Sequence, residues 1–182
     1  MSTFEFVSVL LSIVISLAIA HLLTGVALAL KAKKLRFDWV LAGWWLFVIM
    51  LCVDYWFSLW RLRDTPVWSL TFVLMWLLLA AITYIAAWLV VPDLEADGTM
   101  DFQAHVADNR KKYLGALTAW VFGGAVVNGY TPSMEPANLL APFFIGVFVA
   151  AIIWKQRPVQ IATLLLSYSG FIYYAWNFIP AL

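Results

Sequence analysis

The sequence is poor in charge. Asp, Glu, Lys and Arg make up 12% of its 182 residues, 65% of the residues are hydrophobic, and the mean hydropathy is +0.92. An ordinary soluble domain carries about 25% charged and about 45–50% apolar residues. A chain of this composition cannot surround its apolar residues with a charged surface, which excludes a soluble globular fold. The net charge of +1 and the high hydrophobicity also exclude intrinsic disorder.

Several chemistries lack the residues that they need. A single cysteine, Cys52, excludes a disulfide framework, and we expect it to be a small apolar packing residue. Neither the His-Glu-x-x-His nor the Gly-x-Ser-x-Gly motif occurs. No basic cluster is large, so we expect no nucleic-acid partner. We therefore expect a protein that is not an enzyme, with no catalytic residues, no metal and no cofactor.

Long apolar runs dominate the sequence instead. A membrane-spanning helix needs about 20 mostly apolar residues, and we predict six of them: Phe4–Leu30, Trp39–Trp60, Val67–Val91, Tyr113–Tyr130, Leu139–Trp154 and Val159–Ile179. The fifth run is short and contains Pro142, which indicates a bend or a half-helix. No Lys or Arg precedes the first run, so we expect a span rather than a cleaved leader. The predicted fold is all-α, a single multi-pass transmembrane domain over residues 1–182.

Positive charge is divided unevenly between the predicted connections. Alternate connections lie on the same side of the membrane, and one side collects nine of the eleven basic residues: Lys31, Lys33, Lys34, Arg36, Arg110, Lys111, Lys112, Lys155 and Arg157. The other side has Arg61 and Arg63. Because cytoplasmic loops are enriched in Lys and Arg, we expect the first side to be cytoplasmic and both termini to lie outside.

The longest connection is Pro92–Lys112. Within it, Phe102 and Val106 are apolar at helical spacing and are followed by three basic residues, which predicts a short amphipathic cytoplasmic helix that runs into the fourth span. Such a helix lies on anionic lipid headgroups or docks a cytosolic partner.

Ionisable groups inside a span are costly and mark candidate sites. His21 lies within the first span, either as a core histidine that is hydrogen-bonded to a hydroxyl or carbonyl, or as part of a proton relay or metal site. Asp54, Ser58 and Arg61 share one face of the second span. The alternatives there are an Asp54–Arg61 ion pair that fixes helix packing and a carboxylate that binds a substrate or a cation.

Two further groups of residues stand out. An outer polar cluster follows from the predicted topology, and a cavity there would open outward: Glu5, Asn128, Glu135 and Asn177. Small residues recur every fourth position along the first and fourth spans, which predicts close helix packing: Ser8, Ser12 and Ser16, then Gly115, Ala119 and Gly123.

Aromatic residues make up 17% of the chain. Most of the tryptophans fall near span ends, where indole rings prefer the headgroup region. Five are placed deeper, where they either pack against neighbouring helices and lipid or line a pocket for a quinone or pigment: Trp44, Trp45, Trp56, Trp76 and Trp120.

Two segments are considered together: Phe4–Ile13 leading to His21–Gly25, and Asp108–Tyr113 at the start of the fourth span. These segments resemble a group of small bacterial inner-membrane proteins of unknown activity. The resemblance implies a bacterial plasma membrane and carries no activity with it.

Two function classes follow from the sequence. The first is a non-enzymatic accessory or structural subunit, which forms a homo-oligomer or part of a larger membrane complex; sparse buried polarity and the small-residue stripes favour it. The second is a transporter or channel for a small solute or proton, which His21, Asp54 and the outer polar cluster favour.

Overall fold

A computed structural model describes residues 3–65, 67–130 and 135–178, with the side chains of residues 135–137 left out of the description. The expected all-α fold is confirmed. The described elements are α1 (Thr3–Lys31), β1 (Lys34–Arg36), α2 (Trp39–Trp60), α3 (Leu70–Val90), β2 (Thr99–Asp101), α4 (Phe102–Gly129), the 3-10 helix η1 (Glu135–Leu140), α5 (Ala141–Ile153) and α6 (Arg157–Phe178).

Three helices are long and apolar enough to cross a membrane, namely α1, α2 and α3. The chain therefore has the character of a membrane protein. The other three helices do not meet the same measure of length and hydropathy: α4 begins with a polar segment, α5 has 13 residues, and α6 carries several polar residues. Length and composition thus do not confirm the expectation of six crossings.

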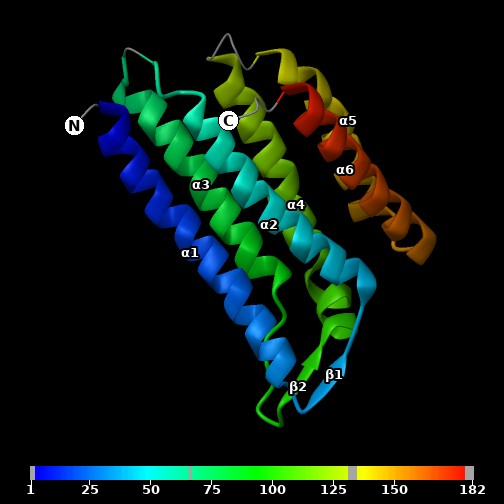
Figure 1. Cartoon of the computed structure of the whole chain (residues 1–182). Helices are drawn as coiled ribbons and strands as arrows, with labels where there is room; N and C mark the ends of the chain where they lie inside the picture. Colours follow the sequence, from blue (N-terminus) through cyan, green and yellow to red (C-terminus); the bar gives the residue numbers. More distant parts are fainter. Residues whose placement is uncertain (1–2, 66, 131–134, 179–182) are drawn as a thin grey trace.

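The helices form one elongated bundle (Figure 1). Helix α3 packs against α1, α2 and α4, while α5 packs against α4 and α6. Figure 1 shows the start of α1 and the end of α6 at the same end of the bundle, which we call the termini end. The opposite end carries β1 and β2 and is called the strand end. The α5–α6 pair stops short of the strands, which leaves a step on that side of the bundle.

Side-chain caps fix where three of the helices begin. Asp38 accepts hydrogen bonds from the backbone N–H groups of Val40 and Leu41 at the start of α2. Ser69 does the same for Phe72 in α3, and Asp101 for Gln103 and Ala104 in α4. Such caps satisfy backbone donors that have no partner within the helix.

The strand end differs from the sequence prediction in two respects. First, the predicted amphipathic helix runs into the fourth span as expected, within the single helix α4, but its apolar face does not lie on a surface. Its apolar face lies against the chain itself, since Phe102 contacts Phe37 and Trp45. Second, β1 and β2 pair in parallel, with Leu35 opposite Met100. Strands of three residues give no recognisable alternation in the sequence.

All six α-helices contribute to the core, whose largest fully buried side chains include Trp44, Tyr55, Trp76 and Tyr113. Helix α1 is peripheral. Its most apolar segment is 28% buried, compared with 56% for α2. A broad face of α1 is therefore available to lipid or to another protein.

Candidate functional site

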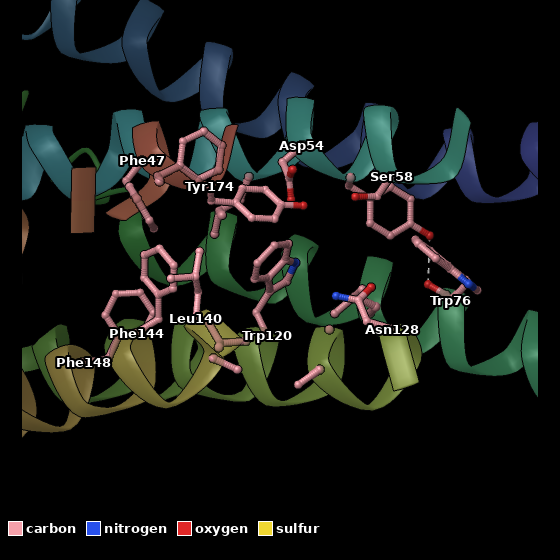
Figure 2. Close-up of a pocket in the computed structure, with 18 residues that line it drawn as sticks. Phe47, Asp54, Ser58, Trp76, Trp120, Asn128, Leu140, Phe144, Phe148 and Tyr174 are labelled. Atoms are coloured by element: carbon pink, nitrogen blue, oxygen red, sulfur yellow. Dashed lines mark hydrogen bonds between the residues drawn. The ribbon is translucent and has the colours of Figure 1, made fainter. Parts of the chain in front are cut away.

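A cavity lies in the termini-end half of the bundle, between α2, α3, α4, α5 and α6 (Figure 2). The cavity volume is about 80 Å³. The walls are mainly apolar and aromatic, with Phe47, Phe144 and Phe148 at one end and Trp120 in the middle. Ligand sites in proteins commonly combine such walls with a few polar groups.

Asp54 is the charged residue of this cavity. The side chain projects from α2 and is 4% exposed, and its Oδ1 atom is buried without a hydrogen-bond partner. Tyr174 reaches from α6 toward Asp54 in Figure 2, and its hydroxyl group donates a hydrogen bond to the Asp54 carboxyl group, so Oδ1 is the one oxygen of that group without a partner. A buried carboxylate oxygen without a partner is energetically costly, which makes Asp54 a candidate binding group.

Three further polar side chains share the cavity with Asp54. Ser58 lies one helical turn farther along α2, Asn128 comes from the end of α4, and Tyr174 comes from α6. The fold therefore brings Asp54 and Ser58 together with one member of the expected outer polar cluster, Asn128.

Two of the aromatic residues have their polar atoms engaged in hydrogen bonds within the protein. The indole Nε1 of Trp120 donates to Thr83 Oγ1 at 2.9 Å, and the Tyr55 hydroxyl donates to the carbonyl oxygen of Trp76 at 2.9 Å. Their rings are thus fixed as cavity wall. Among the five deep tryptophans named above, Trp76 and Trp120 line the cavity, whereas Trp44 packs edge-to-face on Phe47 and Phe148.

Arg61 does not line the cavity. Its Nη1 donates to the carbonyl oxygen of Phe178 at 3.0 Å, which joins the end of α2 to the end of α6. The positive charge of Arg61 acts on Asp54 from outside the cavity lining, and a direct ion pair between the two side chains stays a prediction.

His21 lies outside the cavity, on the α1–α3 side of the bundle. Its ring stacks on Trp88 with the centroids 3.9 Å apart and the planes 14° from parallel. The Nε2 atom is buried and has no hydrogen-bond partner. His21 is not among the residues that line the cavity. The cavity lining therefore contains no polar path from Asp54 to His21.

The other members of the outer polar cluster are dispersed. Glu5 is exposed near the start of α1. Asn177 is exposed and donates to the Tyr173 carbonyl oxygen of its own helix at 2.8 Å. The side chain of Glu135 lies outside the described part of the chain.

The residues of the small-residue stripes are half-buried or exposed, and none of the six is fully buried. Ser8 and Ser12 are half-buried, whereas Ser16 is exposed, and the Ser12 hydroxyl donates to the backbone of Ser8. On α4, Ala119 is exposed. A Cβ atom at Gly115 would meet no neighbouring atom within 4 Å, and one at Gly123 would meet Leu79 at 3.4 Å.

Sequence reasoning missed Tyr174 and the polar face of α6. Gln160, Thr163 and Ser167 are all buried on this face. They recur at three- and four-residue spacing, and Tyr174 continues the same row one step beyond Gly170. That periodicity is visible in the sequence and is typical of a helix whose polar side faces other helices.

Comparison with known proteins gives no match for this chain: no protein-family model, no curated protein and no solved structure is significantly similar to it. The resemblance to small bacterial inner-membrane proteins therefore stays an expectation.

Proposed function

We propose that this chain is a multi-pass membrane protein that binds a small organic cation at Asp54, as a carrier or receptor for that solute. The observation that supports the proposal most directly is the buried, unpartnered Oδ1 of Asp54 inside a cavity with aromatic walls. A cation would supply the missing partner. Aromatic ring faces attract alkylammonium groups, and this attraction strengthens when the groups are desolvated.

The donor set favours an organic cation over a metal ion. A metal site needs several ligands, commonly three or more His, Cys, Asp or Glu side chains. No such group occurs among the described residues. Asp54 contributes one carboxylate, while Phe47, Phe144 and Trp120 contribute hydrophobic surface. An alkylammonium ion matches both properties.

The charge distribution supports an outward-facing mouth. Six crossings would place nine basic residues on the cytoplasmic side and two on the other. The cavity lies in the half of the bundle away from the strand end, near Ser58 and Asn128. On this topology, in a bacterial plasma membrane, a solute would enter from outside.

Binding is tested by calorimetry on the purified protein in lipid nanodiscs, with a series of primary alkylammonium ions from methylammonium to butylammonium, whose N–H groups can donate to the Asp54 carboxylate. We expect at least one member of the series to bind saturably. We also expect Asp54→Asn to weaken that binding by about tenfold or more, because the substitution removes the charge and keeps the shape.

The matched control is Asp64→Asn. Asp64 lies near the same end of the bundle, its side chain is 85% exposed, and it pairs with Arg63 at 3.4 Å. This substitution changes the net charge equally and should leave binding unchanged. Equal losses in the two variants, or no binding by any ion of the series, would refute the proposal.

A second candidate function is that of a structural subunit, favoured by the exposed face of α1. Less of α1 is buried than of the other two apolar helices, and Ser16, Ala20 and Thr24 are exposed on it. Small residues on a lipid-facing helix permit close approach of a second helix. The two functions are compatible, since the Asp54 cavity lies away from α1.

A further inference from the structure

A basic groove lies at the strand-end limit of the α5–α6 pair, separate from the Asp54 cavity. It is formed where the first turns of α4 pass the start of α6, beside the start of α2. Five basic side chains line it, namely Arg110, Lys111, Lys112, Lys155 and Arg157, together with the carboxylates of Asp38 and Asp108.

Arg110 and Gln160 build the floor of the groove. The Arg110 guanidinium group donates to the carbonyl oxygens of Ala151, Ile152 and Trp154 at the end of α5. Gln160 donates to the carbonyl oxygens of Ala151 and Trp154 at 2.8 and 2.7 Å. These carbonyl groups have no partners within their own helix. Both side chains therefore stabilise the end of α5 through these hydrogen bonds.

The carboxylate of Asp38 also has partners within the protein. It caps α2 and forms an ion pair with Arg157. The negative charge of Asp38 is thus offset by Arg157, whose own side chain is exposed.

The three lysines differ from the floor residues because they are exposed. Lys111, Lys112 and Lys155 form no ion pair with a described carboxylate, and Lys112 donates to the Asn109 side chain at 2.9 Å. Asp108 is the one other acidic residue of the groove. The rim therefore carries an excess of positive charge.

Tryptophans place this rim at the level of the lipid headgroups. Trp39 at the start of α2 is 78% exposed and Trp154 at the end of α5 is 50% exposed, and both residues adjoin the groove. Exposed indole rings prefer the membrane interface. Next to the rim, α5 and α6 present the exposed apolar residues Ile153, Ile161 and Leu165.

We propose that this groove binds the phosphate of an anionic phospholipid, whose acyl chains lie along α5 and α6. The lysine rim provides the charge, and the adjoining apolar surface distinguishes a lipid from a free anion. Basic pockets between helices at the membrane interface are suited to such headgroups. The proposal does not depend on ligand binding at Asp54.

The test is native mass spectrometry of the purified full chain, titrated in detergent with phosphatidylglycerol, cardiolipin or phosphatidylcholine. We expect saturable binding of an anionic lipid and none of phosphatidylcholine. The triple variant Lys111→Gln, Lys112→Gln, Lys155→Gln should lose affinity for the anionic lipid by a factor on the order of a hundred.

The control is the triple variant Lys31→Gln, Lys33→Gln, Lys34→Gln. These lysines are exposed at the same end of the bundle, outside the groove, and their removal costs the same net charge. This variant should retain its affinity within about threefold, since charge effects at the surface are local. Circular dichroism establishes that both variants are folded.

Three outcomes would overturn the proposal. Equal losses in the two triple variants would indicate diffuse surface attraction. Unchanged binding in the groove variant would place the lipid elsewhere. Displacement of the lipid by millimolar inorganic phosphate, with phosphate itself binding the wild-type groove, would identify a site for soluble anions.

Discussion

At the scale of single residues, Arg110 illustrates how buried charge is used in this chain. Arg110 is 6% exposed, and its guanidinium group donates hydrogen bonds to three carbonyl oxygens at the end of α5. Arg110→Ala should therefore lower the free energy of unfolding by about 3 kcal/mol, because the buried carbonyl groups lose their charged donor. Arg110→Lys should recover part of that loss, since an ammonium group lacks the guanidinium fork.

Unfolding in detergent, followed by circular dichroism, measures this prediction. Lys111→Ala is the neighbouring control. Lys111 is exposed, and its removal should change the unfolding free energy by less than about 0.5 kcal/mol. Equal effects of the Arg110 and Lys111 substitutions would contradict the role assigned to Arg110.

The residues of the candidate site were only partly predictable. The cost of charge in a span singles out Asp54 directly. Its companions Asn128 and Tyr174 come from α4 and α6, and their approach to Asp54 depends on tertiary packing that sequence spacing does not reveal. Arg110 was assigned to a basic surface, because nothing in the sequence indicates that the end of α5 would cover it.

At the scale of secondary-structure elements, the sequence predicts close helix contacts at Gly115 and Gly123 of α4. The closest contacts in the structure are made by other glycines. A Cβ atom at Gly25 would lie 2.6 Å from atoms of both Trp45 and Val91. Gly25→Ala should therefore destabilise the packing of α1 by about 1–3 kcal/mol. Gly115→Ala, where a Cβ atom meets nothing within 4 Å, should be neutral or stabilising by up to about 1 kcal/mol, since alanine favours the helix.

Thermal unfolding of the two single variants tests this contrast. A larger loss at Gly115 than at Gly25 would show that the α4 stripe contacts another molecule or that α1 packs differently.

The start of α4 should respond to acid. Asp101 accepts backbone hydrogen bonds from Gln103 and Ala104 and pairs with Arg36 at 2.9 Å. The Ala104 N–H, with a further contribution from Arg36, holds the pKa of Asp101 below its ordinary value. A carboxyl group with a lowered pKa stabilises the fold above its unfolded-state pKa, and the contribution is lost as the pH falls through the folded-state value.

The melting temperatures of wild type and Asp101→Ala should therefore differ at pH 7 and converge as the pH falls below about 4, the ordinary range for Asp. A melting-temperature difference that is constant from pH 7 to pH 3 would contradict this account.

The elements themselves were predicted unequally well. The boundaries of α1 and α2 follow from long apolar runs with basic or capping residues at their ends. The end predicted for the sixth span, Ile179, lies outside the described residues. The strand pair was missed because it depends on one contact between Lys34–Arg36 and Thr99–Asp101, more than sixty residues apart, and the turn at Gly98, with φ at 83°, adds only a local signal.

At the scale of the whole molecule, the exposed side of α1 predicts association. The double variant Ser16→Leu, Ala20→Leu should weaken any homo-oligomer, because larger side chains prevent close helix approach. Both positions are exposed within one chain, so the fold should be retained. Chemical crosslinking in nanodiscs measures the oligomeric state, and Leu23→Ala, also exposed on α1, is a control that adds no bulk. A wild-type protein that is monomeric in several lipids would contradict the prediction.

The central claim is that the Asp54 cavity opens outward and selects cations, and the most direct measurement is thiol labelling of Ser58→Cys in a Cys52→Ala background, in intact cells. Ser58 lines the cavity, is half-buried and lies four residues after Asp54, whereas Cys52 is fully buried.

Two membrane-impermeant methanethiosulfonate reagents are compared, one with a trimethylammonium group and one with a sulfonate. We predict labelling from outside that is about tenfold faster with the cationic reagent, because the carboxylate concentrates cations in the cavity. Adding Asp54→Asn should remove this preference. No labelling from outside, or equal rates with both reagents, would contradict the account.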